Sequence, residues 1–371
     1  MKKNGEYLIC QNNVSVSMLL KNWVNYIEKN LFKNHAGFYE LPYLANNPKL
    51  MIDSVLALPI SMHNMVQQAI YTNNDFIRGV MRYRKVEEGL WLVANHFEIK
   101  KNMVCKAMYD SEVISDHYFL SFAVFEYKFP TNNDFTHFAT LLSTTCTFYK
   151  PNTEVDTYFY ENTSGKFYNI VFSKEWAQKN LFFKSEQHAD ELQAFLNAER
   201  GFINWLDIVP DAECISKNLW AKLENEQEGV FDTAFLKVTI HQIVTDFFNA
   251  TYKDKRIKNY PQLNNQDYAG VAKAECTLLN NLMNPFIGVE NISKAVNMCP
   301  TKLKIIFKSV FGFSMLQYHK EKNMLLALQL IKNSTMQIRN IALLTGFESA
   351  SKFTAAFKKR FSMLPSAIRN N

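Results

Sequence analysis

The clearest pattern of apolar and polar positions lies in the last eighty or so residues, where one helical pattern occurs twice. Apolar side chains recur at steps of three and four residues, first at Leu303, Ile306, Phe307 and Val310, and then at Phe353, Ala356, Phe357 and, with a basic residue in fourth place, Arg360. This spacing is typical of helices that bury one face. The pattern predicts two copies of a helix, a tight turn and a second helix.

The remaining positions of both second helices face outward, and they are small, hydroxylic or basic. In the first copy they are Thr301, Lys302, Lys304, Ile305 and Lys308, and in the second they are Ala350, Ser351, Lys352, Thr354, Ala355, Lys358 and Lys359. Side chains of these kinds at the start of a helix suit the major groove of DNA. The pattern therefore indicates two DNA-reading helices.

Between the copies, Ser314 to Lys332 carries apolar residues at mixed helical spacings. This predicts a long helix, buried over much of its circumference, that joins the two helix-turn-helix units rigidly. Two reading helices held in this way would enter successive turns of the major groove, about 34 Å apart on one face of DNA.

Positive charge is concentrated in the same region. From Asn281 to the end there are thirteen Lys and Arg against three Asp and Glu, a balance of +10, so the other residues carry −4 of the total of +6. Each neutralised phosphate adds about −0.9 to the salt slope of binding. A field of this size predicts salt-sensitive DNA affinity.

The repeat resembles the DNA-binding domain of AraC/XylS-type transcription regulators over about a quarter of the chain. The residues that carry the resemblance are Cys299, Pro300, Leu303, Phe307, Lys308, Gly312, Phe313, Ser314, Tyr318, Ala327, Leu330, Ile331, Ile338, Ile341, Ala342, Gly346, Phe347, Ser351, Phe353, Phe357, Lys358, Lys359, Arg360, Phe361, Pro365 and Arg369. Many spaced matches of this kind make the resemblance specific.

The resemblance implies roles for the outward residues. It places base-reading positions at Thr301, Lys304 and Ile305 in the first unit, and at Ala350, Ser351, Thr354 and Ala355 in the second. The lysines at 302, 304, 308, 352, 358 and 359 would hold phosphates. Ile305 and Ala355 stand where the family usually has arginine, so neither can pair with guanine as arginine does. Ser362 stands where glycine is usual, and Ile368 where an aromatic residue is common.

Upstream, residues 89–173 consist of short β-rich runs separated by polar turns, which implies a barrel or jelly roll. Many AraC-type regulators carry a cupin-like β-barrel sensor ahead of the DNA-binding unit. The expected fold class is therefore α+β, with an N-terminal cupin-like β-barrel and helices followed by an all-α domain with two helix-turn-helix units. The expected division is residues 1–86, an extension of uncertain fold; 87–173, the barrel; 174–253, a helical dimerisation or linker region; and 265–371, the DNA-binding domain.

Two features of the N-terminal part bear on function. Aromatic residues of the β-rich region are candidates for a ligand pocket: Trp91, Tyr118, Phe122, Phe148, Tyr158 and Tyr168. Val230 to Tyr252 shows an apolar helical face, which either takes part in dimerisation or packs within its own domain. Asp254 to Asp267, polar and interrupted by Pro261, is the best linker candidate.

Other chemistry finds little support. His96, His117 and His137 are about twenty residues apart with no HxH or HExxH, and the six cysteines form no CxxC, so we expect neither a metal site nor a cofactor. No nucleotide-binding glycine motif occurs. The polar start and the lack of a stretch of about 20 apolar residues lead us to expect a soluble cytoplasmic protein without a membrane partner.

The favoured hypothesis is a sequence-specific transcription regulator, by family mostly an activator that recruits RNA polymerase. It would bind double-stranded promoter DNA as a homodimer and sense an unknown small-molecule effector or other signal. Two alternatives stay open: the barrel only dimerises, or it is an enzyme whose reaction tunes DNA binding. The sequence itself suggests no catalytic residues.

Overall fold

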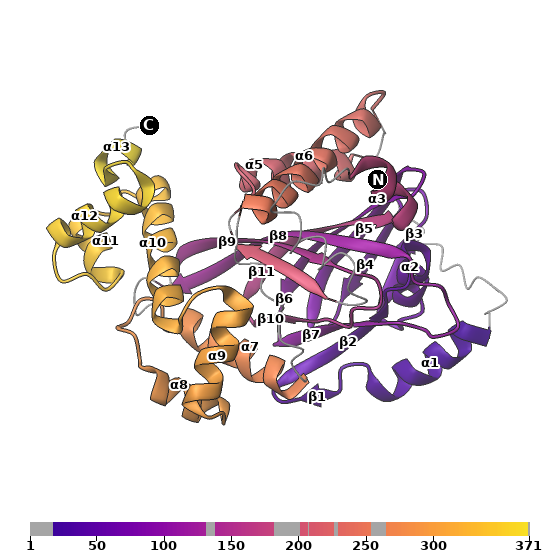
Figure 1. The fold of residues 1–371 in the computed structure, drawn as a ribbon, viewed down its shortest axis with the longest axis horizontal. Helices are drawn as coiled ribbons and strands as arrows, with labels where there is room; N and C mark the ends of the chain where they lie inside the picture. Colours follow the sequence, from indigo (N-terminus) through magenta and orange to yellow (C-terminus); the bar gives the residue numbers. More distant parts are fainter. Residues whose placement is uncertain are drawn as a thin grey trace, which may run out of the picture.

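The computed structural model describes residues 18–130, 138–181, 201–206, 208–225, 229–253 and 265–369. Within these residues the chain forms two β-sheets, helices packed on their outer faces, and a helical C-terminal part at one end (Figure 1). Most of the expected linker, residues 254–264, lies outside the described residues, as does His137.

The two sheets have different sizes and strand directions. The four-stranded sheet has the order β1-β2-β7-β10, with strands β1 (Asn34–His35), β2 (Phe38–Leu44), β7 (Met103–Met108) and β10 (Asp156–Phe159). In it β2 and β7 are parallel. The eight-stranded sheet is antiparallel, with the order β12-β9-β8-β11-β6-β5-β4-β3. Its strands are β3 (Ser61–Asn64), β4 (Ala69–Asn73), β5 (Ile77–Glu87), β6 (Leu90–Ile99), β8 (His117–Pro130), β9 (Phe138–Tyr149), β11 (Thr163–Ser173) and β12 (Phe202–Leu206).

The sheets face each other and enclose a cavity lined by residues of both. The expected fold class, α+β with a β-rich N-terminal part and a helical C-terminal domain, is confirmed. Within the described residues neither sheet closes on itself, so the β-rich part is a pair of facing sheets rather than a closed barrel. The expected boundary at residue 86 falls inside β5, which pairs with β6 along its length.

Helices cover the outer face of the larger sheet. Strand residues alternate between the two faces, so Leu120, Phe122 and their alternating neighbours face away from the cavity. They pack against α3 (Lys174–Asn180), α5 (Ala212–Glu224) and α6 (Asp232–Lys253). The predicted apolar face of α6, which includes Ile240 and Phe247, is fully buried here. That face therefore packs within its own domain. α1 (Met18–Asn30) and α2 (Pro48–Leu56) lie at the end of the sheets that is far from the C-terminal part (Figure 1).

The C-terminal part contains the predicted repeat. Its helices are α7 (Asn265–Asn280), α8 (Val289–Val296), α9 (Pro300–Phe311), α10 (Met315–Asn333), α11 (Ile338–Leu344), α12 (Ala350–Phe361) and α13 (Pro365–Arg369). The pairs α8–α9 and α11–α12 are the two helix-turn-helix units, and the predicted long helix between them is α10. No helix in the described ranges combines the length and apolar character that a membrane span needs.

The C-terminal part is docked against the sheets mainly through α7 and α10. α10 packs along β9, and α7 packs near β10. One continuous apolar cluster contains Phe38 and Leu141 of the sheets together with Leu278 of α7 and Phe307 of α9. In contrast, α11–α13 stand away from the sheets (Figure 1).

Candidate nucleic-acid interface

The start of α9 exposes the predicted reading face of the first unit. Asn297 ends α8 in a left-handed conformation, and Pro300 occupies the first turn of α9, where a missing N–H costs nothing. Leu303, Ile306 and Phe307 are buried as predicted. The outward residues Thr301, Lys302, Lys304, Ile305 and Lys308 are all exposed. Ile305, the position usual for arginine, has 65% of its surface exposed, so this face offers an apolar contact in place of a cation.

The second unit presents an equivalent face on α12. The Ser349 side chain caps this helix by accepting a hydrogen bond from the Lys352 amide at 3.3 Å. Phe353 and Phe357 are buried. Ser351, Lys352, Ala355, Lys358 and Lys359 are exposed, and Ala350 and Thr354 are half-buried. The structure thus brings every predicted DNA-contacting residue to the outward side of α9 or α12.

Ion pairs that the sequence analysis missed modify this charge. Lys302 Nζ lies 2.6 Å from Asp267 Oδ1, whose helix α7 packs beside α9. Lys352 pairs with Glu348, one turn earlier. Arg360 continues the buried stripe in sequence, but it is exposed and its Nη2 lies 2.5 Å from Glu321 Oε1 of α10. A carboxylate one helical turn from a lysine could have revealed the Glu348 pair. The other two depend on tertiary packing.

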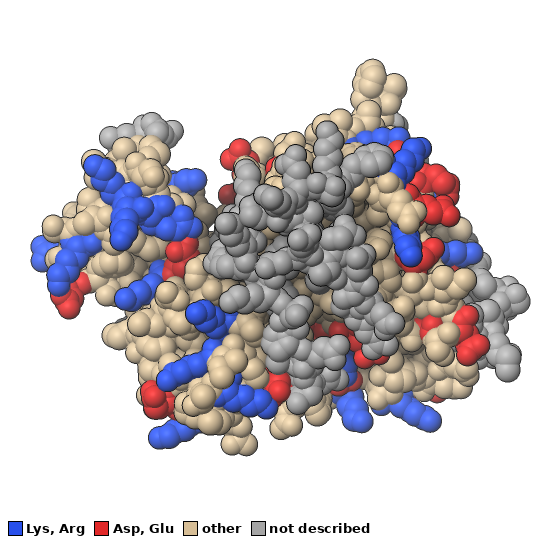
Figure 2. All heavy atoms as spheres, viewed as in Figure 1, with Lys and Arg blue, Asp and Glu red and all other residues tan. Residues whose placement is uncertain are grey.

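The connecting helix α10 fixes the two units relative to each other. Ser314 and Gln317 form a reciprocal capping box at its start, with bonds of 3.3 Å and 3.0 Å. Met315, Leu326, Ala327 and Ile331 of this helix are buried. The Arg360 pair with Glu321 also ties α12 to α10. Lys and Arg side chains gather on the outer surface of this C-terminal part (Figure 2).

The cavity between the sheets is a separate candidate site, with a volume of about 180 Å³. Its walls are mostly aliphatic and aromatic, with hydroxyl and amide groups from residues such as Ser121, Thr147, Tyr149, Asn95 and Asn169. None of the lining residues is charged. No group of three or more His, Cys, Asp or Glu side chains suited to a metal ion occurs in the part of the chain that the structure describes.

The six aromatic residues that we predicted for a ligand pocket are not among those that line this cavity. Tyr118, Phe122, Phe148 and Tyr168 lie on the opposite face of the larger sheet, where they pack beneath α5 and α6. Strand alternation predicts that half of the aromatic residues point inward, but it cannot say which half. Trp91 packs with Val93 and Met81 beside the cavity.

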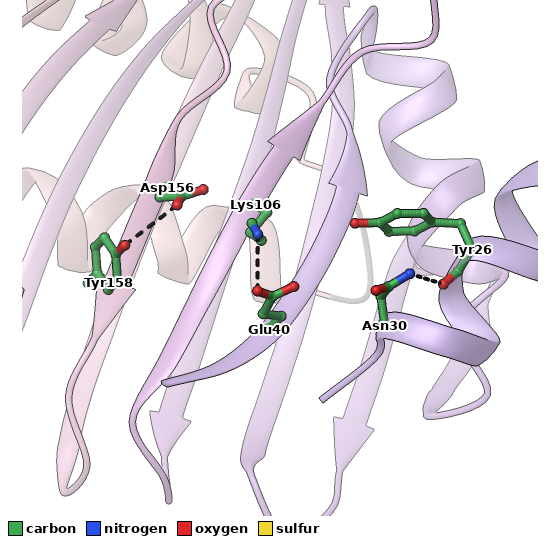
Figure 3. Close-up of polar contacts among 6 residues, drawn as sticks. All are labelled: Tyr26, Asn30, Glu40, Lys106, Asp156 and Tyr158. Atoms are coloured by element: carbon green, nitrogen blue, oxygen red, sulfur yellow. Dashed lines mark hydrogen bonds and ion pairs between the residues drawn. The ribbon is translucent and has the colours of Figure 1, made fainter. Parts of the chain in front are cut away.

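Tyr158 lies on the outer face of the smaller sheet (Figure 3). Its hydroxyl lies 3.5 Å from Asp156 Oδ2, while on the neighbouring strands Lys106 Nζ lies 3.0 Å from Glu40 Oε1. Burial lowers the pKa of Lys106, but the hydrogen bond to Glu40 and the negative charges of Glu40 and Asp156 together outweigh it and leave that pKa raised. Tyr158 therefore belongs to a polar patch of paired groups rather than to the cavity.

Comparison with known proteins identifies the C-terminal part. A family described as a helix-turn-helix domain matches residues 292–371. PqrA from Proteus vulgaris, a probable transcription factor, is 32% identical over 88 residues, which are 24% of this chain and 72% of that protein. The chain belongs to the AraC family of helix-turn-helix transcription regulators.

A second relative matches over a similar C-terminal stretch. ExsA, a transcriptional regulator from Pseudomonas aeruginosa, is 38% identical over 81 residues, which are 22% of this chain and 29% of ExsA. The chain therefore matches less than a third of that relative. ToxT from Vibrio cholerae O395 aligns with 76% of this chain and 97% of its own at 14% identity, with a TM-score of 0.28.

Proposed function

We propose that this protein is a transcription activator that binds promoter DNA with α9 and α12. The observation that carries the proposal is the pair of outward helix faces, both hydroxylic and basic, mounted on one buried connecting helix. In this proposal Thr301, Ser351 and Thr354 approach base edges. Ile305 and Ala355 make apolar contacts, for which a thymine methyl group is suited.

Phosphate contacts would come from the exposed lysines of both helices. Within the described residues, Lys304, Lys308, Lys358 and Lys359 form no ion pair, whereas Lys302 and Lys352 share their charge with carboxylates. RNA polymerase is the proposed protein partner, on family grounds alone. ExsA and PqrA support the regulatory role through the shared domain.

Selection of genomic DNA fragments by the full-length protein at near-physiological salt tests this function. The proposal expects enrichment of a motif with two half-sites about one helical turn apart. Loss of that enrichment in a Lys304→Ala, Thr354→Ala double variant would tie it to α9 and α12. A fragment pool that stays unenriched with the folded wild-type protein would refute the function.

We further propose that the cavity between the sheets binds the effector. Because its lining is uncharged and mostly apolar, the suited ligand is a neutral, largely apolar small molecule with one or two hydroxyl or carbonyl groups. Thermal unfolding with pooled compounds tests this. A ligand at a hundred times its Kd adds about 2.7 kcal/mol of stability. Neutral pools should raise the unfolding temperature, and a response to carboxylic or phosphoric acids alone would contradict the proposal.

Dimerisation is proposed through the surface of α6 that faces away from the sheet. Val238 and Tyr252 are exposed there on one side of the helix, and Phe231 is exposed just before the helix begins. Sedimentation of the wild type and of Val238→Asp tests this, because a buried carboxylate at the interface would shift a dimer to monomers.

We also propose a revised division, in which the β-rich domain begins near Asn34 and the DNA-binding domain at Asn265, because β5 and β6 form one sheet.

A further inference from the structure

A buried polar cluster lies where the C-terminal part meets the sheets. We call Glu275, Tyr160, Tyr318, Lys322 and Ser143 the Glu275 cluster. The Glu275 carboxyl group accepts hydrogen bonds from the hydroxyl groups of Tyr160, at 2.5 Å, and Tyr318. Lys322 donates to Ser143 of β9. Lys322 has only 2% of its surface exposed, Tyr160, Tyr318 and Ser143 are also buried, and Glu275 is half-buried.

This arrangement joins segments that are far apart in sequence. Glu275 belongs to α7, and Tyr318 and Lys322 belong to α10, whereas Ser143 and Tyr160 come from the sheet domain. Removing an ionised group from water costs several kcal/mol, which only well-placed hydrogen bonds offset. Apolar side chains of similar volume would usually hold such an interface at least as firmly. The polar groups therefore add little to the strength with which α7 and α10 pack on the sheets. Instead, they fix a single position of these two helices relative to the sheets.

The cluster is continuous with the wall of the cavity. Strands β8 and β9 pair in register, with Phe125 opposite Ser143 and Ala123 opposite Thr145. Phe125, Ala123 and Thr145 all line the cavity. Cross-strand partners have Cβ atoms about 5 Å apart on the same face of a sheet. Ser143, which accepts from Lys322, is thus the cross-strand neighbour of a cavity-lining residue.

The smaller sheet makes the same connection. Phe159 at the end of β10 lines the cavity, and Tyr160, the next residue, donates to Glu275 and lies 3.1 Å from the Ala272 carbonyl oxygen. A change in the shape of the cavity that moves Phe125 or Phe159 therefore acts on both ends of the cluster. The two ends hold α7, which packs against α8 and α9 of the first helix-turn-helix unit, and the connecting helix α10.

We propose that the Glu275 cluster is the device through which the occupancy of the cavity sets the position of α7 and α10, and with them the placement of α9 on DNA. This inference rests on the proposed function and adds its means of regulation. Filling the cavity would displace Ser143 or Tyr160. The cluster would then no longer hold α10 in one position against the sheet, and the affinity of the protein for DNA would change. The second helix-turn-helix unit, which stands away from the sheets, would follow through α10.

A double-mutant cycle on the full-length chain tests the inference without a known ligand. Ala123→Leu fills the cavity from β8, and Ala107→Leu fills it from β7. Each should change the Kd for a selected DNA fragment by about fivefold or more. In a Lys322→Met background the same fillers should change Kd by less than about twofold, because the hydrogen bond from α10 to Ser143 of the sheet is cut. The control Lys320→Met removes an exposed charge from the same helix and should leave the filler effect intact.

Hydrogen exchange of α10 amides gives a second measure that does not involve DNA. Protection around Tyr318 and Lys322 should change by about fivefold or more in both filler variants and not in fillers that also carry Lys322→Met. Fillers that leave both Kd and protection unchanged would overturn the inference, as would equal filler effects with and without Lys322. A wild-type protein that selects no DNA would instead overturn the proposed function, and this inference with it.

Discussion

Ser362 occupies the position in the second copy of the repeat that Gly312 occupies in the first. Gly312 ends α9 with φ of 75°, and Ser362, fifty residues later, ends α12 with φ of 59°. Both positions are in the left-handed region, which suits glycine and strains residues with a Cβ. A Cβ at Gly312 would meet no atom within 4 Å. A serine at this position would therefore differ from glycine in stability only through backbone strain.

Exchanging the two residues should have opposite effects on stability. We expect Gly312→Ser to lower the free energy of unfolding by about 1 kcal/mol and Ser362→Gly to raise it by up to about 1 kcal/mol. Urea denaturation of both variants measures these changes. Ser366→Gly in α13 is a matched control, which should destabilise slightly, as glycine within a helix does. A destabilised Ser362→Gly would show that the Ser362 side chain matters more than its backbone.

Glu275 predicts a pH dependence at the same scale. Burial raises the pKa of its carboxyl group above the ordinary 4.5, against the lowering effects of the Tyr160 and Tyr318 hydrogen bonds and of Lys322. A carboxyl group whose pKa is raised by folding contributes less stability as the pH rises from 4.5 through its folded pKa. Unfolding free energies of the wild type and Glu275→Gln, measured from pH 4 to 8, should therefore diverge, with the wild type losing more. Parallel curves would contradict this assignment.

Among the elements, the helices of the repeat were predicted well and the cavity was not. Steps of three and four residues locate Leu303 and Phe353 on buried faces because a helix repeats by itself, whatever its neighbours are. A strand gives only alternation, so Phe122 was a reasonable pocket candidate until the sheet showed that α6 covers its face. Strands β3–β5 were missed because β3 and β4 are short and because basic residues interrupt the apolar positions of the longer β5.

The ion pair of Lys302 changes what its helix contributes to DNA binding. Because Lys302 is paired with Asp267 and Lys308 is exposed on the same helix, their removal should have unequal effects. Lys308→Ala should reduce the magnitude of the salt slope, log Kd against log salt, by about 0.9, the contribution of one phosphate. Lys302→Ala should reduce it by less. Fluorescence anisotropy on one DNA fragment at several salt concentrations compares them, and a larger effect of Lys302→Ala would contradict the pairing.

For the whole molecule, the sequence predicted the two parts but not how they are joined. Composition, charge and periodicity separate a β-rich part from a basic helical part within one chain. The contacts of Glu275 with Tyr160 and of Lys322 with Ser143 span more than a hundred residues each. No local pattern specifies such pairs, since they depend on how the sheets end and where α7 and α10 pack.

Whether α9 and α12 bind DNA is tested by the affinity of the full-length protein for a selected promoter fragment, with and without the changes Lys304→Ala and Thr354→Ala. We predict that the double variant, still folded by circular dichroism, binds the fragment at least about tenfold more weakly and loses preference over unrelated DNA. Unchanged affinity and unchanged preference in the folded double variant would show that α9 and α12 do not read this DNA.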